Sequence, residues 1–227
     1  MSSALESRAA LTLVTGAAVG AVRQLLARLS GSPEKQRTDL LEAVPELIAY
    51  YADGSSALAA DFYDDERERA GAGGRFTAEP VVLDRVEKIR RAVVWASEPM
   101  FDEALDVTSP QRLAEVVQLE TARPYRDTIT TNRRRDPESA GWRRVTSGQG
   151  CKFCRMLADK GAIFREETAR FASHPHCSCT AWPVFRSNDG GVSADVMQYV
   201  ASKRKRTDAE KAALRDYLNE HFPDAPG

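Results

Sequence analysis

Residues 151–179 begin with Cys151-Lys-Phe-Cys154 and end with His174-Pro-His176-Cys177-Ser-Cys179. This one stretch of the 227-residue chain contains all four cysteines and two of the three histidines. Thiolates and imidazoles that converge on one point are ligands that zinc prefers in proteins. The stretch therefore predicts a small module that folds around one zinc ion.

Each half of the stretch has a spacing that suits a metal. Two cysteines separated by two residues form a turn in which backbone N–H groups hydrogen-bond the sulfurs, and Cys151 and Cys154 fit this pattern. In an extended Cys177-Ser-Cys179 segment, both side chains point to the same face, so both sulfurs can bind.

The second half offers more ligands than zinc needs, and two ligand sets stay open. One set is the four cysteines, and the other is three cysteines with one histidine. A histidine outside the set would instead donate a hydrogen bond to a ligand. A fully supplied site is structural, because a catalytic zinc keeps one position open for water. The candidate ligands are Cys151, Cys154, His174, Cys177 and Cys179, with His176 as a competing histidine.

Most of the remaining chain is predicted to be helical, because apolar residues recur at helical spacing. The expected helices cover residues 5–29, 33–51 with a kink at Pro45, 55–69 after a turn at Asp53-Gly54, 82–95, 110–123, 125–134 after a break at Pro124, and 207–221. Residues 180–185 are β-prone. The fold class is mainly α, with a helical N-terminal domain and a small α+β module stabilised by zinc.

Three regions follow from these patterns. Residues 1–135 are expected to form the helical domain, with a flexible break near residues 70–75. A linker at residues 136–141 leads to the Cys/His zinc module at residues 141–186, and residues 190–227 form C-terminal helices and a tail.

The composition is globular, with 42% hydrophobic and 29% charged residues and a net charge of −1. This balance does not favour a dedicated nucleic-acid binder. The apolar region of residues 9–29 is interrupted by polar residues, so we expect no transmembrane helix and no signal peptide. In a cytosol, clustered cysteines are metal ligands rather than disulfides.

Several motifs of the second half resemble the minor head proteins of tailed bacteriophages that are similar to phage Mu protein F. The resemblance covers about residues 120–185 and rests on Gly141-Trp142-Arg-Arg144, Cys151-Lys-Phe-Cys154-Arg-Met-Leu157, Gly161-Ala-Ile-Phe164 and His174-Pro-His-Cys177-Ser-Cys179. The N-terminal part, with Ala59-Ala-Asp-Phe-Tyr63, looks like the matching region of actinobacterial phages. His176 occupies the variable position of the H-P-x-C-x-C motif.

This resemblance implies a structural minor capsid protein that is made in the host bacterial cytoplasm and lies inside the head of the virion. It would act in head assembly near the portal, or in genome delivery. Its partners would be the portal protein, the major capsid protein or both, with no membrane and no small-molecule substrate. A capsid maturation protease is the alternative function.

Two charged segments have an ordinary interpretation as solvated surface. The basic one could instead make non-specific contacts with the phosphates of packaged DNA, and the acidic one could pair with it or hold a cation. The basic residues are Arg123, Arg126, Arg133, Arg134, Arg135, Arg143 and Arg144, followed later by residues 203–206; the acidic ones are Asp61, Asp64, Asp65, Glu66 and Glu68.

Enzyme chemistry is poorly supported by the sequence. A serine protease needs a base beside its nucleophile, but His221 is the one histidine outside the cysteine stretch and neither Ser147 nor Ser173 lies in a G-x-S-x-G motif. An H-E-x-x-H helix is absent, and Thr-Ala-Trp-Pro follows Cys179 where a zinc-anchored nuclease would need further catalytic residues. We therefore expect a structural protein with no catalytic residues.

Overall fold

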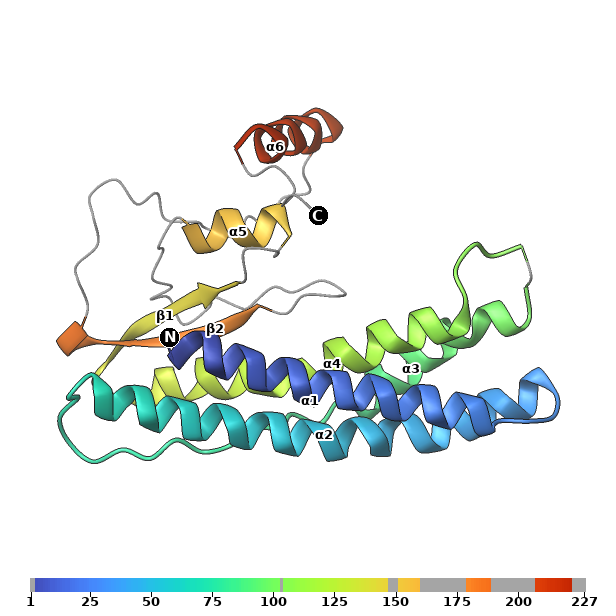
Figure 1. Ribbon diagram of the computed structural model, residues 1–227, viewed down its shortest axis with the longest axis horizontal. Helices are drawn as coiled ribbons and strands as arrows, with labels where there is room; N and C mark the ends of the chain where they lie inside the picture. Colours follow the sequence, from blue (N-terminus) through green and yellow to red (C-terminus); the bar gives the residue numbers. More distant parts are fainter. Residues whose placement is uncertain (1–2, 103, 147–150, 160–178, 189–206, 222–227) are drawn as a thin grey trace.

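The computed structural model describes residues 3–102, 104–146, 151–159, 179–188 and 207–221. Its helices are α1 (Ser3–Arg28), α2 (Pro33–Arg69), α3 (Val86–Ser97), α4 (Ser109–Arg135), α5 (Lys152–Asp159) and α6 (Asp208–His221), with short 3-10 turns at Glu98–Met100 and Arg186–Asn188. Strands β1 (Ser139–Val145) and β2 (Thr180–Phe185) form an antiparallel pair. The predicted mainly α fold is confirmed (Figure 1).

α2 is one continuous helix of 37 residues. The predicted kink at Pro45 does not divide the helix, and the predicted turn at Asp53-Gly54 is wrong. An interior proline costs about 3 kcal/mol and an interior glycine about 1 kcal/mol. Burial along the whole helix offsets these costs, with Leu40, Val44, Ile48, Ala52, Ala59, Phe62 and Tyr63 all buried.

The starts of α2 and α4 were predicted to within one residue, whereas α3 begins at Val86, four residues later than expected. Ser32 caps α2 and Pro33 is its first residue, as predicted. α4 begins one residue earlier than expected, since its cap is Thr108, whose backbone N–H donates to Gln111 Oε1 at 2.9 Å. α4 then continues through Pro124, so the predicted break there is wrong.

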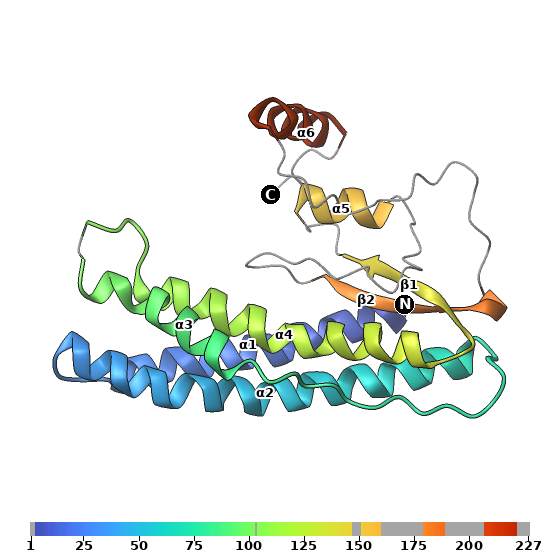
Figure 2. The same cartoon turned by 180° about the vertical axis from the view of Figure 1, so that it is seen from behind.

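α1, α2, α3 and α4 pack into an elongated bundle (Figures 1 and 2). One cluster of its buried residues contains Val22, Leu40, Val44, Val93 and Leu113, so all four helices contribute to it. α2 and α4 are also joined by a buried hydrogen bond, in which Ser55 Oγ donates to the Thr121 carbonyl oxygen at 2.7 Å.

The segment between α2 and α3 runs back along the bundle (Figure 2). Its backbone N–H groups at Ala78 and Val81 donate to Asp64 Oδ1 and Thr128 Oγ1, both at 2.9 Å. The Arg67 guanidinium donates to backbone carbonyl groups of residues 72–74, where the flexible break was expected. Gly71 and Gly74 have φ angles of 61° and 71° there, a conformation that favours glycine.

The two strands share a core with the helices. β2 matches the predicted β-prone segment, whereas β1 begins at Ser139, inside what was expected to be a linker. Trp142 of β1 and Phe185 of β2 are 1% and 0% exposed. They belong to one buried cluster with Tyr63 of α2, Tyr125 and Ile129 of α4, and other residues of the bundle. The strands of the predicted zinc module are therefore packed on the helical part of the chain.

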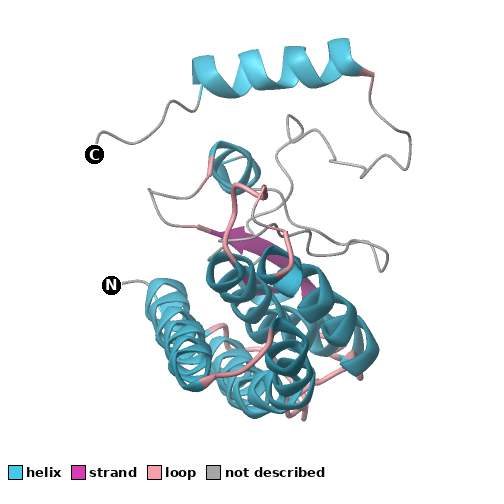
Figure 3. Ribbon diagram, turned by 90° about the vertical axis from the view of Figure 1, so that its right-hand side faces the viewer, coloured by secondary structure: helices cyan, strands magenta, loops and turns pink. Residues whose placement is uncertain are grey.

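α5 and α6 complete the described structure. Figure 3, which looks along the bundle, shows the sheet above the bundle helices, with α5 and then α6 beyond it. Lys152 Nζ of α5 donates to Asn219 Oδ1 of α6 at 2.8 Å. The predicted C-terminal helix at residues 207–221 is confirmed by α6.

α1 does not meet the expectation that the chain has no helix long and apolar enough to span a membrane. From Leu5 to Arg28 it is long and apolar enough to cross a membrane, by length and composition alone. The polar residues that interrupt residues 9–29 are mostly threonine and glycine, which lower the mean hydropathy of such a helix only slightly. Core helices of soluble proteins and signal sequences near an N-terminus meet the same criterion. Leu11, Ala18 and Val22 of α1 are buried against the bundle, but only 22% of the apolar window is buried.

We predict that Phe185→Ala lowers the free energy of unfolding by about 3–5 kcal/mol, because it leaves a cavity where strand and helices meet. The matched control is Leu83→Ala, since Leu83 is 56% exposed, and its effect should be about 0.5 kcal/mol or less. Urea unfolding followed by circular dichroism measures both. Equal effects of the two substitutions would contradict the shared core.

Candidate metal centre

The register of the sheet brings the two halves of the cysteine stretch to one place. Val145, the last residue of β1, pairs with Thr180, the first residue of β2. The chain therefore leaves β1 and enters β2 at the same end of the sheet. Cys151 and Cys154 follow this exit, and Cys179 directly precedes the entry. Antiparallel pairing therefore brings the two ends of the cysteine stretch to the same end of the sheet.

Two of the cysteines are in contact. Cys154 and Cys179 are 1% and 2% exposed and form a small buried cluster of their own. Cys151 is exposed and stands immediately before α5, where its Sγ accepts the backbone N–H of Cys154 at 3.3 Å. An N–H group directed at a sulfur across a C-x-x-C turn is the geometry that a metal-binding knuckle requires.

Two buried arginines approach this cluster from different elements. Arg144 of β1, 5% exposed, donates from Nη1 to Cys154 Sγ at 3.8 Å. Arg126 of α4, 2% exposed, donates from Nε to the Cys179 carbonyl oxygen at 3.0 Å. A positive charge beside sulfur stabilises the thiolate, which is the form that binds metals. Arg126 also ties the second half of the cysteine stretch directly to the bundle.

Three candidate ligands, His174, Cys177 and the competing His176, lie outside the described residues. Among the residues that the structure describes, no group of three or more Cys, His, Asp or Glu side chains gathers at one point. Of the described cysteines, Cys154 and Cys179 pack together, and Cys151 contacts Cys154 through the Cys154 backbone N–H. A bound zinc ion would supply a structural cross-link between the two halves.

A second polar cluster fastens the sheet to the bundle. Glu66 of α2, which was predicted to be solvated, is 4% exposed and accepts the indole N–H of Trp182 at 2.7 Å. Arg67 donates from Nε to Asp136 Oδ2 at 3.1 Å, and both side chains are at most one-tenth exposed. Burial raises the pKa of Tyr63, and the nearby Asp136 carboxylate raises it further, so its hydroxyl stays protonated and donates to Asp136 at 3.3 Å.

The basic segment is less available than the sequence suggested. Besides the two buried arginines, Arg123 pairs with Glu120 at 3.5 Å and Arg135 pairs with Glu79 at 2.7 Å. Burial raises the pKa of Asp127 on the same helix, while Arg123 opposes this effect. Part of the basic charge that was considered for DNA contact is therefore engaged within the chain. The second basic run, residues 203–206, lies outside the described residues.

The protease alternative draws no support from the described histidine. His221 lies on α6, half exposed, with Nε2 3.8 Å from Glu220 and its ring against Tyr217. Ser147 and Ser173 lie outside the described residues. The contacts of Arg126 and Arg144 with the cysteines were missed by sequence reasoning, because no local pattern shows which arginine turns inward.

Comparison with known proteins decides the family. Residues 2–219 match the sequence model of the VG15 protein family, nearly the whole chain. The chain belongs to the VG15 protein family. VG15 proteins are phage proteins, so the predicted phage origin is supported at this coarser level. No curated protein and no solved structure matches the chain.

In this VG15 protein, we predict that Asp136→Ala lowers the free energy of unfolding by about 3–5 kcal/mol, because it leaves the buried Arg67 without its carboxylate. Asp65→Ala is the matched control, since Asp65 pairs with Arg69 at 3.7 Å but is 64% exposed. Its effect should be about 0.5 kcal/mol or less. Urea midpoints at neutral pH give both values, and an Asp136→Ala effect as small as the control would show that the buried pair is not stabilising.

Proposed function

We propose that this VG15 protein is a structural minor capsid protein of a tailed phage. It lies inside the head and acts in head assembly near the portal, or in genome delivery, through contacts with the portal or major capsid protein. The observation that carries the proposal is the packing of Cys154 against Cys179. The minor-head signature combines C-x-x-C with H-P-x-C-x-C, and these two cysteines belong one to each motif.

A structural zinc ion is part of this proposal. Its ligands are Cys151, Cys154 and Cys179, completed by Cys177 or by His174. The described part of the module has a two-stranded sheet and one eight-residue helix, which is little structure to form a core of its own. Metal binding contributes directly to the folding free energy of such small segments.

A surface suited to another head protein lies at the far end of the bundle. The connection between α3 and α4 is at the end opposite the sheet (Figures 1 and 2). Apolar side chains on and beside it are about two-fifths exposed: Val94, Trp95, Phe101 and Val107. Exposed apolar groups gathered in one region favour protein–protein contact.

We predict that the purified chain carries one zinc ion and that Cys154→Ser loses it. The matched control is His221→Ala, which removes a histidine outside the cysteine stretch and should keep the metal. Elemental analysis after gel filtration measures the zinc content, and cobalt substitution reports thiolate ligands by their charge-transfer absorption. A wild-type chain without zinc, or a Cys154→Ser variant that keeps it, would refute the metal proposal.

We also predict that the protein is found in purified virions in fewer copies than the major capsid protein. Quantitative mass spectrometry of gradient-purified particles measures this, and Trp95→Glu should reduce incorporation several-fold without unfolding the chain. Leu83→Glu is the control for added surface charge. A protein that is absent from particles, yet required for cleavage of the major capsid protein, would support the protease alternative.

A further inference from the structure

The outward face of α1 carries an apolar stripe. The residues of this stripe are three or four positions apart, so they share one face of the helix, and each is exposed or half-exposed. They are Glu6, Ala10, Leu13, Ala17, Gly20, Gln24 and Arg28. Leu13 is 75% exposed. Figure 3 shows α1 at one side of the bundle, with no described element over its outer face. The stripe is uncharged between Glu6 and Arg28.

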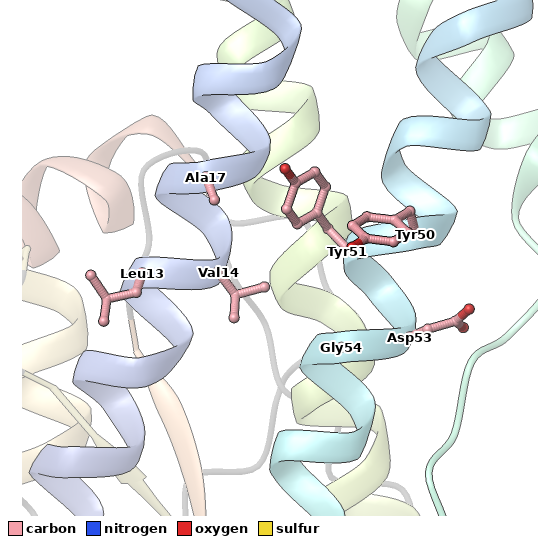
Figure 4. Close-up of a pocket in the computed structure, with 7 residues that line it drawn as sticks. All are labelled: Leu13, Val14, Ala17, Tyr50, Tyr51, Asp53 and Gly54. Carbon is pink, nitrogen blue, oxygen red and sulfur yellow. The ribbon is translucent and has the colours of Figure 1, made fainter.

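A groove runs along one side of this stripe, between α1 and α2. Leu13, Val14 and Ala17 line it from α1, and residues 50–54 contribute Tyr50, Tyr51, Asp53 and Gly54 from α2. Its volume is about 600 Å³. Figure 4 shows Val14 directed toward α2 and the Tyr51 ring directed toward α1. Tyr50, at the rim, is 75% exposed.

Two glycines of α1 and one glycine of α2 are not explained by packing within the chain. A Cβ atom at Gly16, Gly20 or Gly54 would meet nothing within 4 Å. Each glycine costs a helix about 1 kcal/mol relative to alanine. Glycine allows another backbone to approach closely, so a second helix lying along α1 would account for residues that the chain's own fold does not require.

The charges at the two ends of the stripe favour a second copy of α1 as the partner helix. Glu6 and Arg28 are placed symmetrically about Ala17, eleven residues on either side. If two copies of α1 pair antiparallel about Ala17, Glu6 of each copy faces Arg28 of the other. Leu13 of each copy then faces Ala21 beside Gly20, so a large side chain meets small ones. Parallel pairing would instead place like charges together, and the helix dipoles also favour the antiparallel arrangement.

We propose that two copies of this protein associate through α1, antiparallel and two-fold symmetric about Ala17, with Leu13 of each copy against the small residues of the other. The contact is isologous, so each copy contributes the same surface. At 1.5 Å per residue, the charged pairs lie about 33 Å apart along the helix, which gives an extended contact. This inference is independent of the zinc site and of the proposed role in the phage head.

Sedimentation velocity of the full chain over a wide concentration range tests the proposal. The wild type should be dimeric, and Leu13→Glu should weaken the dimer on the order of a hundredfold, because it would bury an uncompensated carboxylate in each copy. Leu83→Glu adds the same charge at another exposed leucine and should leave the dimer unchanged. Circular dichroism verifies that all variants are folded.

Charge reversal then tests the antiparallel register. Glu6→Arg should weaken the dimer about tenfold, because arginines would face arginines at both ends. Adding Arg28→Glu to that variant should restore the wild-type affinity. A wild-type chain that stays monomeric, whether or not it binds phosphatidylcholine vesicles through α1, overturns the proposal. A dimer that resists Leu13→Glu, or a double variant that is not restored, also overturns it.

Discussion

Packing of one face of the β1–β2 sheet against α2 and α4 is the contact on which the rest of the structure depends. Trp142 and Phe185 belong to the same buried cluster as Tyr63 and Tyr125. Around this apolar contact, Glu66 accepts the Trp182 indole N–H, and Arg67 pairs with Asp136, which lies between α4 and β1. Because buried polar groups need partners, these contacts favour one orientation of the sheet on the bundle.

The cysteine site depends on this orientation. The sheet fixes where the chain leaves β1 and enters β2, and Arg126 of α4 holds the Cys179 carbonyl group from the bundle side. Cys154 reaches the same point from α5, with Arg144 of β1 beside its sulfur. Helices, strands and candidate ligands are therefore linked through one set of contacts. A metal bound here would add a cross-link between cysteines that the packing of the sheet on the bundle already brings close together.

Much of the helical architecture could be predicted from the sequence, since apolar periodicity and the Ser32-Pro33 start mark it directly. The failures at Pro45, Asp53-Gly54 and Pro124 share one cause: local signals for a break were outweighed by burial along a long helix. β1 was missed because Gly141 and two arginines obscure its alternation. Arg144 is buried and donates to Cys154, a contact that no local sequence pattern shows. The proximity of Cys154 and Cys179 agrees with the motif spacing, whereas the arginines beside them were not predicted.

The most direct test is whether sheet and bundle unfold together. In a Trp95→Phe background the two remaining tryptophans, Trp142 and Trp182, lie in β1 and β2, so their fluorescence reports the sheet while far-ultraviolet circular dichroism reports the helices. The shared core predicts that both signals change at the same urea concentration in the metal-free chain. Loss of the tryptophan signal at clearly lower urea, with the helical signal intact, would show that the strands form a separate unit and would contradict this account.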